Sequence, residues 1–119
     1  MRSKEELKEA VSAAIDQRSE RIVGLGEAIM DRPELGFKEE NTARCVSEVF
    51  RELELEHERE LALTGVKGRL KGKKPGPTLA LMGELDALIV PDHPRADAQT
   101  GAAHACGHNA QIAGLMGAA

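Results

Sequence analysis

The stretch that decides how this 119-residue chain is interpreted reads His-Ala-Cys-Gly-His-Asn, from His104 to Asn109. It places the thiol of Cys106 two residues before the imidazole of His108, and both groups are ligands that suit divalent transition metals, Zn²⁺ first. Gly107 between them can take backbone angles closed to other residues, so a loop can aim both side chains at one point. The pattern therefore predicts that Cys106 and His108 bind a metal. A buried cysteine beside a helix-capping histidine, with no metal, is the alternative.

A second informative stretch precedes this motif, from Pro77 to Asp86. Residues 77–83 form a nearly all-apolar run after a Pro-Gly-Pro turn, which is typical of a strand buried on both faces. Glu84 and Asp86 follow at the spacing that puts two carboxylates on one face of a strand. Ligands of open α/β sheets bind at the C-terminal ends of strands, and buried carboxylates need a cation or hydrogen bonds. The pattern predicts a ligand site there; the alternative is a solvent-facing Glu84 and an Asp86 that caps the next turn.

The rest of the chain predicts helices and strands of ordinary length. Ser3 and Glu6 form the pattern of a capping box at the start of an amphipathic helix, and Asn109 is a good N-cap for a helix after the metal motif. With the buried strand, these elements predict an α/β fold class. The expected elements are helices at 3–31, 39–55 and after 109, and strands at 56–63 and 65–71.

Five motifs occur in order along the chain, and together they resemble one known family. They are Pro33–Phe37, Thr64–Val66, Pro75–Thr78, Glu84–Leu88 and His104–His108. In this order and spacing they look like the N-terminal part of an M20-family metallopeptidase, of the amidohydrolase branch that cleaves N-acyl amino acids and similar amides. The resemblance implies a zinc-peptidase-like α/β/α catalytic domain, a dinuclear site filled by Zn²⁺ or Mn²⁺, and hydrolysis of amide bonds.

The resemblance also implies roles for particular residues. Cys106 and His108 match the two metal ligands of the family's His-Ala-Cys-Gly-His motif. Asp86 matches an aspartate that orients a metal-binding histidine in the wider family, which makes it the candidate catalytic residue. Glu84 stands where that histidine lies in the peptidase branches. Asn109 stands where many members of the branch carry aspartate, so the substrate is less well defined.

Other family features belong after Ala119: the glutamate general base, a further carboxylate ligand, two histidines, and the satellite domain through which full-length relatives form homodimers. We therefore expect residues 1–119, as an N-terminal portion of the catalytic domain, to bind metal weakly and to hydrolyse little alone. Two other hypotheses stay open. One is a non-catalytic metal-binding or interaction module derived from such an enzyme. The other is a Cys106 nucleophile with His104 or His108 as its base.

Composition favours a soluble globular protein, with 41% hydrophobic and 30% charged residues. The net charge of −4 argues against nucleic acid or an anionic membrane as a partner. No apolar run approaches the ~18 residues of a membrane span, and the first residues lack the apolar region of a signal peptide. Cys45 and Cys106 make no disulfide framework, so we expect a cytoplasmic protein. The partner that the resemblance implies is a small amide or peptide-like molecule.

Overall fold

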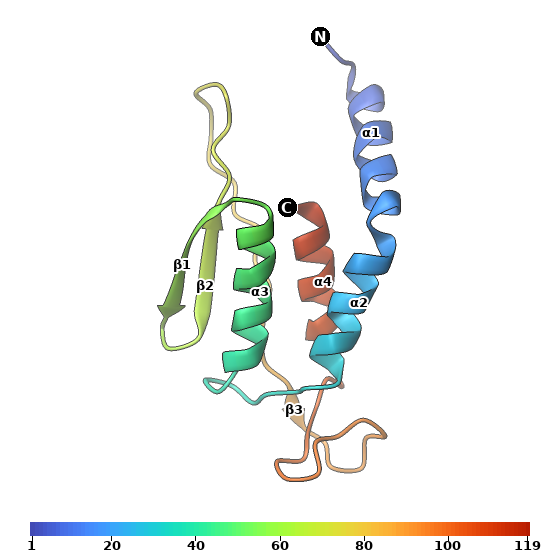
Figure 1. Cartoon of the computed structure of the whole chain (residues 1–119), viewed down its shortest axis with the longest axis vertical. Coiled ribbons are helices and arrows are strands. Elements are labelled where there is room, and N and C mark those ends of the chain that lie inside the picture. Colours follow the sequence, from blue (N-terminus) through green and yellow to red (C-terminus); the bar gives the residue numbers. More distant parts are fainter.

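The computed structural model describes all 119 residues and confirms the α/β class, with helices and two small antiparallel sheets (Figure 1). Helices α2, α3 and α4 lie together, and the β1–β2 hairpin packs against α3. None of the helices has the length and apolar character needed to cross a membrane. In chain order the elements are α1 (Lys4–Gln17), α2 (Ser19–Met30), α3 (Glu40–Glu52), β1 (Glu56–Leu61), β2 (Gly65–Arg69), β3 (Leu88–Ile89), β4 (Ala102–Ala103) and α4 (His108–Ala118).

The first predicted helix is divided in two. Its capping box forms as expected: the Ser3 hydroxyl accepts from the Glu6 N–H at 3.2 Å, and the Glu6 carboxylate accepts from the Ser3 N–H at 2.7 Å. The expected continuity to residue 31 is wrong, because Arg18 has φ −109° and ψ 7° and separates α1 from α2. Helix α1 buries none of its residues and projects from the body (Figure 1). The radius of gyration is 16.0 Å, against about 13.5 Å for a compact chain of this length.

The hydrophobic core lies where α2, α3 and α4 meet. Helix α3 follows its predicted boundaries closely and turns an apolar stripe inward, as an amphipathic helix does. Helices α2 and α4 approach closely at Gly26, where an added Cβ would lie 3.2 Å from the Cβ of Ala113. The core residues are Leu25, Ile29, Val46, Val49, Phe50, Ile112 and Met116.

Residues 77–83 do not form the buried strand that the sequence predicts. No strand lies between Arg69, the end of β2, and Leu88, the start of β3. Leu79, Leu81 and Met82 are 87%, 71% and 87% exposed. A strand buried on both faces needs neighbouring strands and covering side chains, and the two observed sheets pair only β1 with β2 and β3 with β4. The prediction is wrong because local composition cannot report whether a partner strand is present.

Candidate functional site

The candidate site centres on His108, the first residue of α4, and the two carboxylates that the sequence singles out. His108 Nδ1 lies 2.8 Å from the main-chain oxygen of Asp86 and 3.1 Å from Asp86 Oδ1. His108 Nε2 lies 3.0 Å from Glu84 Oε2. The side chain of His108 is 14% exposed, whereas those of Asp86 and Glu84 are 37% and 65% exposed. The structure thus brings Glu84 and Asp86 to one imidazole, on opposite sides of its ring.

Gly107 sets the direction in which α4 leaves the motif. Its φ of +102° lies in the left-handed region, as the sequence predicts for the residue between Cys106 and His108. Gly107, not Asn109, is the N-cap of α4, and its carbonyl accepts from two amide groups of the first turn at 3.1 Å each. Asn109 lies inside the helix and donates through Nδ2 to the Gly26 carbonyl at 3.3 Å. The prediction of Asn109 as the N-cap is wrong, because the left-handed backbone of Gly107 ends the loop two residues before Asn109.

Cys106 is exposed and forms no disulfide. This exposure contradicts the alternative in which a buried cysteine has only a packing role. The nucleophile hypothesis gains no support either, because the two ring nitrogens of His108 contact Asp86 and Glu84. A cysteine nucleophile needs a base within hydrogen-bond reach of its sulfur. The thiol is therefore accessible to a ligand and is not paired with His108.

Glu34, which the sequence reasoning did not single out, holds the site in place. Its main-chain oxygen accepts from the Ala87 N–H at 2.8 Å, beside a parallel bridge between Leu35 and Ala87. Its carboxylate accepts from the N–H of Asn41 at 3.0 Å and of Thr42 at 2.7 Å, at the start of α3. One residue thus fixes the segment after Asp86 to the N-terminus of α3. The signal that could have found it is its position inside the motif Pro33–Phe37.

The motif Thr64–Val66 also has a structural role. Thr64 Oγ1 donates to Glu39 Oε2 at 2.7 Å, which ties the β1–β2 turn to the residue before α3. At Gly65 an added Cβ would lie 2.6 Å from the Leu61 carbonyl oxygen, so this position excludes a side chain. Two of the five motifs therefore position elements around the site and do not line it.

His104 is buried, with 5% of its surface exposed, and neither ring nitrogen has a hydrogen-bond partner. Burial lowers its pKa from the ordinary value, and the nearby His108 lowers it further, while Asp86 opposes both. Through its ring it makes no hydrogen bond to the neighbouring residues of the motif. It is the one imidazole in the motif with two unsatisfied nitrogens.

Comparison with known proteins finds similar peptidases and amidohydrolases. The chain is 39% identical over 102 residues to thermostable carboxypeptidase 1 of Saccharolobus solfataricus, a match of 82% of this chain and 26% of that protein. It is 35% identical over 118 residues to thermostable carboxypeptidase 2 of the same organism, covering 96% of this chain and 30% of the relative. It is 33% identical over 118 residues to an N-acyl-L-amino acid amidohydrolase of Geobacillus stearothermophilus, covering 94% of this chain and 31% of the relative.

These similarities are consistent with the M20 family. The chain spans less than a third of the length of these relatives. No protein-family model and no solved structure matches it. The observed helices and small sheets are compatible with a fragment of an M20 peptidase domain.

The side chains around His108 fit a divalent metal in type. An imidazole held through Nδ1 by a carbonyl, with carboxylates and a thiol nearby, is the donor chemistry that Zn²⁺ takes in proteins. No three such side chains surround one point, because Glu84 and Asp86 contact opposite nitrogens of His108. The assignment of Cys106 and His108 as metal ligands stays a prediction.

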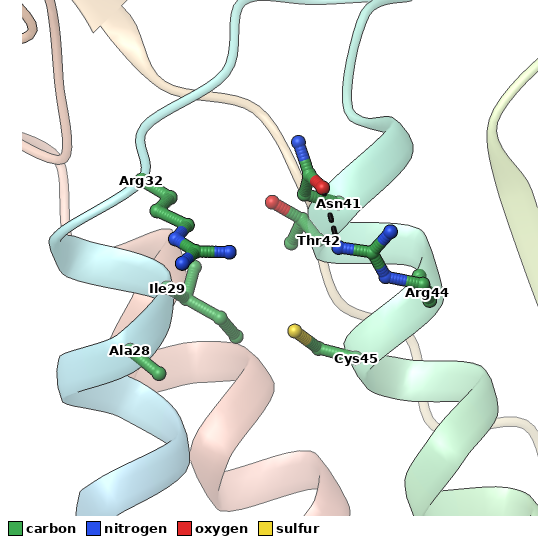
Figure 2. Close-up of a pocket in the computed structure, with 7 residues that line it drawn as sticks. All are labelled: Ala28, Ile29, Arg32, Asn41, Thr42, Arg44 and Cys45. Carbon is green, nitrogen blue, oxygen red and sulfur yellow. Dashed lines mark hydrogen bonds between the residues drawn. The ribbon is translucent and has the colours of Figure 1, made fainter.

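A pocket lies elsewhere in the chain, between α2 and α3 (Figure 2). Its volume is about 20 Å³, which is room for roughly one water molecule. Arg44 donates to Asn41 Oδ1 at 2.6 Å on its α3 side, and Arg32 enters from the α2 side (Figure 2). Burial raises the pKa of the Cys45 thiol in its wall. The pocket is too small for an organic ligand, and none of the residues around His108 lines it.

Proposed function

We propose that this chain supplies part of the metal site of a hydrolase that cleaves amide bonds in N-acyl amino acids or dipeptide-like molecules. The observation that carries the proposal is the orientation of His108. A carbonyl oxygen can only accept a hydrogen bond, so the contact with the Asp86 oxygen at 2.8 Å puts the proton on Nδ1. Nε2 then keeps its lone pair for a metal, which is how protein carbonyls prepare metal-binding histidines. The names of the relatives support the amide-hydrolase class.

The proposed roles follow from these contacts. His108 binds the metal through Nε2, Cys106 binds it through an exposed sulfur, and Asp86 holds the imidazole in the correct orientation and tautomer. A bound Zn²⁺ or Mn²⁺ would supply Lewis acidity toward the amide carbonyl and a nucleophilic water near neutral pH. Asp86 thus acts through His108 and holds the Nδ1 proton in place during the reaction. Two assigned ligands predict weak metal binding and little hydrolysis by this chain alone.

The proposal also covers the compartment in which the enzyme acts and its partners. We propose a cytoplasmic enzyme acting on a small-molecule amide, with no nucleic acid or membrane as partner. Its full-length relatives are proposed to be homodimers. The net charge of −4 supports the exclusion of nucleic acid and anionic membranes, because such polyanions bind proteins with basic surfaces.

A chimaera tests this function directly. The matched 118 residues would replace their counterpart in the N-acyl-L-amino acid amidohydrolase of Geobacillus stearothermophilus, and release of amino acids from N-acetyl amino acids would be measured. We expect metal-dependent hydrolysis that falls at least a hundredfold in H108A and C106S. E40Q, an exposed change at the first residue of α3 that removes no contact with His108, is the matched control. A folded chimaera that hydrolyses nothing, or one indifferent to H108A, contradicts the proposal.

A non-catalytic interaction module is the second candidate, and a specific observation favours it. Leu79, Leu81 and Met82 present an exposed apolar run, and exposed patches of this kind mark interaction sites. The chimaera separates the two candidates, because a module that has lost the catalytic role of its ancestor would not support metal-dependent turnover.

A further inference from the structure

Residues 77–83 combine exposed apolar side chains with free backbone groups. The chain makes no helix, turn or bend along this stretch, which runs lengthwise between β2 and β3 (Figure 1). Leu79, Leu81 and Met82 are 87%, 71% and 87% exposed. None of the N–H and C=O groups of residues 77–83 makes a backbone hydrogen bond. Free backbone groups beside apolar side chains form a template on which another strand can pair.

The charges at the two ends of this stretch have opposite signs. Three lysines lie at positions 71–74 before it, Glu84 and Asp86 follow it, and residues 75–83 carry no charge. Two copies of the stretch that pair antiparallel would place the lysines of each copy beside the carboxylates of the other. Parallel pairing would place like charges together, which destabilises a pair of strands. The stretch is therefore complementary to itself in the antiparallel direction.

One register suits the side chains and the backbone together. It places Ala80 opposite Ala80 of a second copy, as a hydrogen-bonded pair. Leu79 then lies opposite Leu81 on both sides of the two-fold axis, in the non-hydrogen-bonded type of pair that brings side chains closest. Pro77 also falls in a non-hydrogen-bonded pair, where its missing N–H costs no bond. We infer that residues 77–83 pair antiparallel with the same residues of a second copy of this chain, centred on Ala80.

The stretch is held at one end and free along the rest. Leu85 packs against the hydrophobic core, and at Gly83 an added Cβ would lie 3.0 Å from a side chain of α4. Residues 77–82, by contrast, are all exposed. The register also places Lys74 opposite Asp86, whose side chain is 37% exposed and can still meet a cation. A second copy can thus reach the free part while the core holds the other end in place.

Sedimentation equilibrium of the whole chain, in chelator and reductant, tests the inference without any contribution from metal. Because a two-stranded contact is weak on its own, the protein concentration should reach about 1 mM. We expect a monomer–dimer equilibrium whose dissociation constant rises at least tenfold in L79K and in L81K. L7K makes the same change at an exposed leucine of α1 and should dimerise like the parent chain. Circular dichroism should show that all variants are folded.

Disulfide trapping tests the register. In a chain that carries C45S and C106S, A80C should form a dimer with itself under copper-phenanthroline oxidation, because the paired Cα atoms lie about 5.5 Å apart. L79C should form a dimer more slowly, because its two copies lie diagonally, about 7–8 Å apart. A14C, at an exposed alanine of α1, is the control.

Each contrary result overturns the inference. A monomer at every concentration, a dimer that L79K and L81K leave intact, or equal trapping of A80C and A14C would do so. Growth into open-ended aggregates with no dimer would also overturn it, because the stretch would then pair without a defined partner or register. None of these results bears on the proposed metal site, since every measurement is made without metal.

Discussion

Replacing Glu34 with alanine is the most informative test of how the site is held together. The Glu34 carboxylate accepts from the N–H and Nδ2 of Asn41 at 3.0 and 3.1 Å, and from the N–H and Oγ1 of Thr42 at 2.7 and 2.8 Å. The Glu34 carboxylate therefore caps α3, because Glu39, the residue at the N-cap position, makes no capping hydrogen bond with its own side chain. Loss of such a cap costs about 1 kcal/mol. The donors of Thr42, which is 2% exposed, would lose their acceptor, at about 1–3 kcal/mol.

We therefore expect Glu34→Ala to lower the free energy of unfolding by about 2–4 kcal/mol. At roughly 4 °C per kcal/mol, the melting temperature should fall by about 8–16 °C. Glu34→Gln keeps one acceptor oxygen and should lose about half as much. Urea denaturation followed by circular dichroism gives the free energy. Glu40→Ala, an exposed change in the same turn, is the control. A Glu34→Ala value within about 0.5 kcal/mol of that control would refute the reasoning.

Three further predictions concern other residues. Gly24→Ala, which has open space around it, should raise the free energy of unfolding by about 0.5–1 kcal/mol. Gly26→Ala should not raise the free energy of unfolding, because its new methyl group would lie 3.2 Å from the Cβ of Ala113 in α4. If urea denaturation gave both variants the same increase, the close packing of α2 and α4 would be contradicted. Iodoacetamide followed by mass spectrometry should label exposed Cys106 before Cys45, whose pKa burial raises, and Zn²⁺ should slow only the Cys106 reaction. Burial lowers the pKa of His104 below its ordinary value of 6.5. As the pH drops, His104 therefore binds a proton in the unfolded chain before it does so in the folded chain, and the free energy of unfolding should fall below about pH 6.5. With a chelator present, His104→Gln should make the free energy of unfolding depend less on pH. An unchanged pH dependence would show that other groups cause it.

The sequence predicts those parts of the fold that depend on neighbours in the chain. The capping box at Ser3 and Glu6, the boundaries of α3, the β1–β2 hairpin and the positive φ of Gly107 all follow from residues within a few positions of each other. In each case the signal is a side chain or a glycine that acts locally, so the prediction did not need knowledge of the tertiary structure.

The features that depend on distant partners were missed. Residues 77–83 have the composition of a buried strand, but strand formation needs neighbouring strands, and none pairs with this run. The break at Arg18 separates two helices whose apolar stripe is continuous in sequence, because α2 packs on α4 while α1 packs on little. Glu34 was missed because its role joins segments that lie far apart in the chain.

The sequence singles out the residues that meet at His108, but it does not predict their arrangement, and the roles of Cys106 and His108 as metal ligands stay a prediction. The pairing of Glu84 and Asp86 with His108 follows from the two stretches that dominate the sequence, and the structure brings these three together. Their division between opposite ring nitrogens could not be predicted, because it depends on where Gly107 directs α4 and on which main-chain atom faces the imidazole.

The central claim is that Cys106 and His108 bind a divalent metal, and metal stoichiometry tests it most directly. The chain would be stripped with a chelator, dialysed against Zn²⁺ or Mn²⁺, and measured by elemental analysis beside Cys106→Ser and His108→Ala. The account predicts about one metal per parent chain and a clear loss in both variants. Metal at background level in the parent, or equal metal in all three proteins, would contradict it.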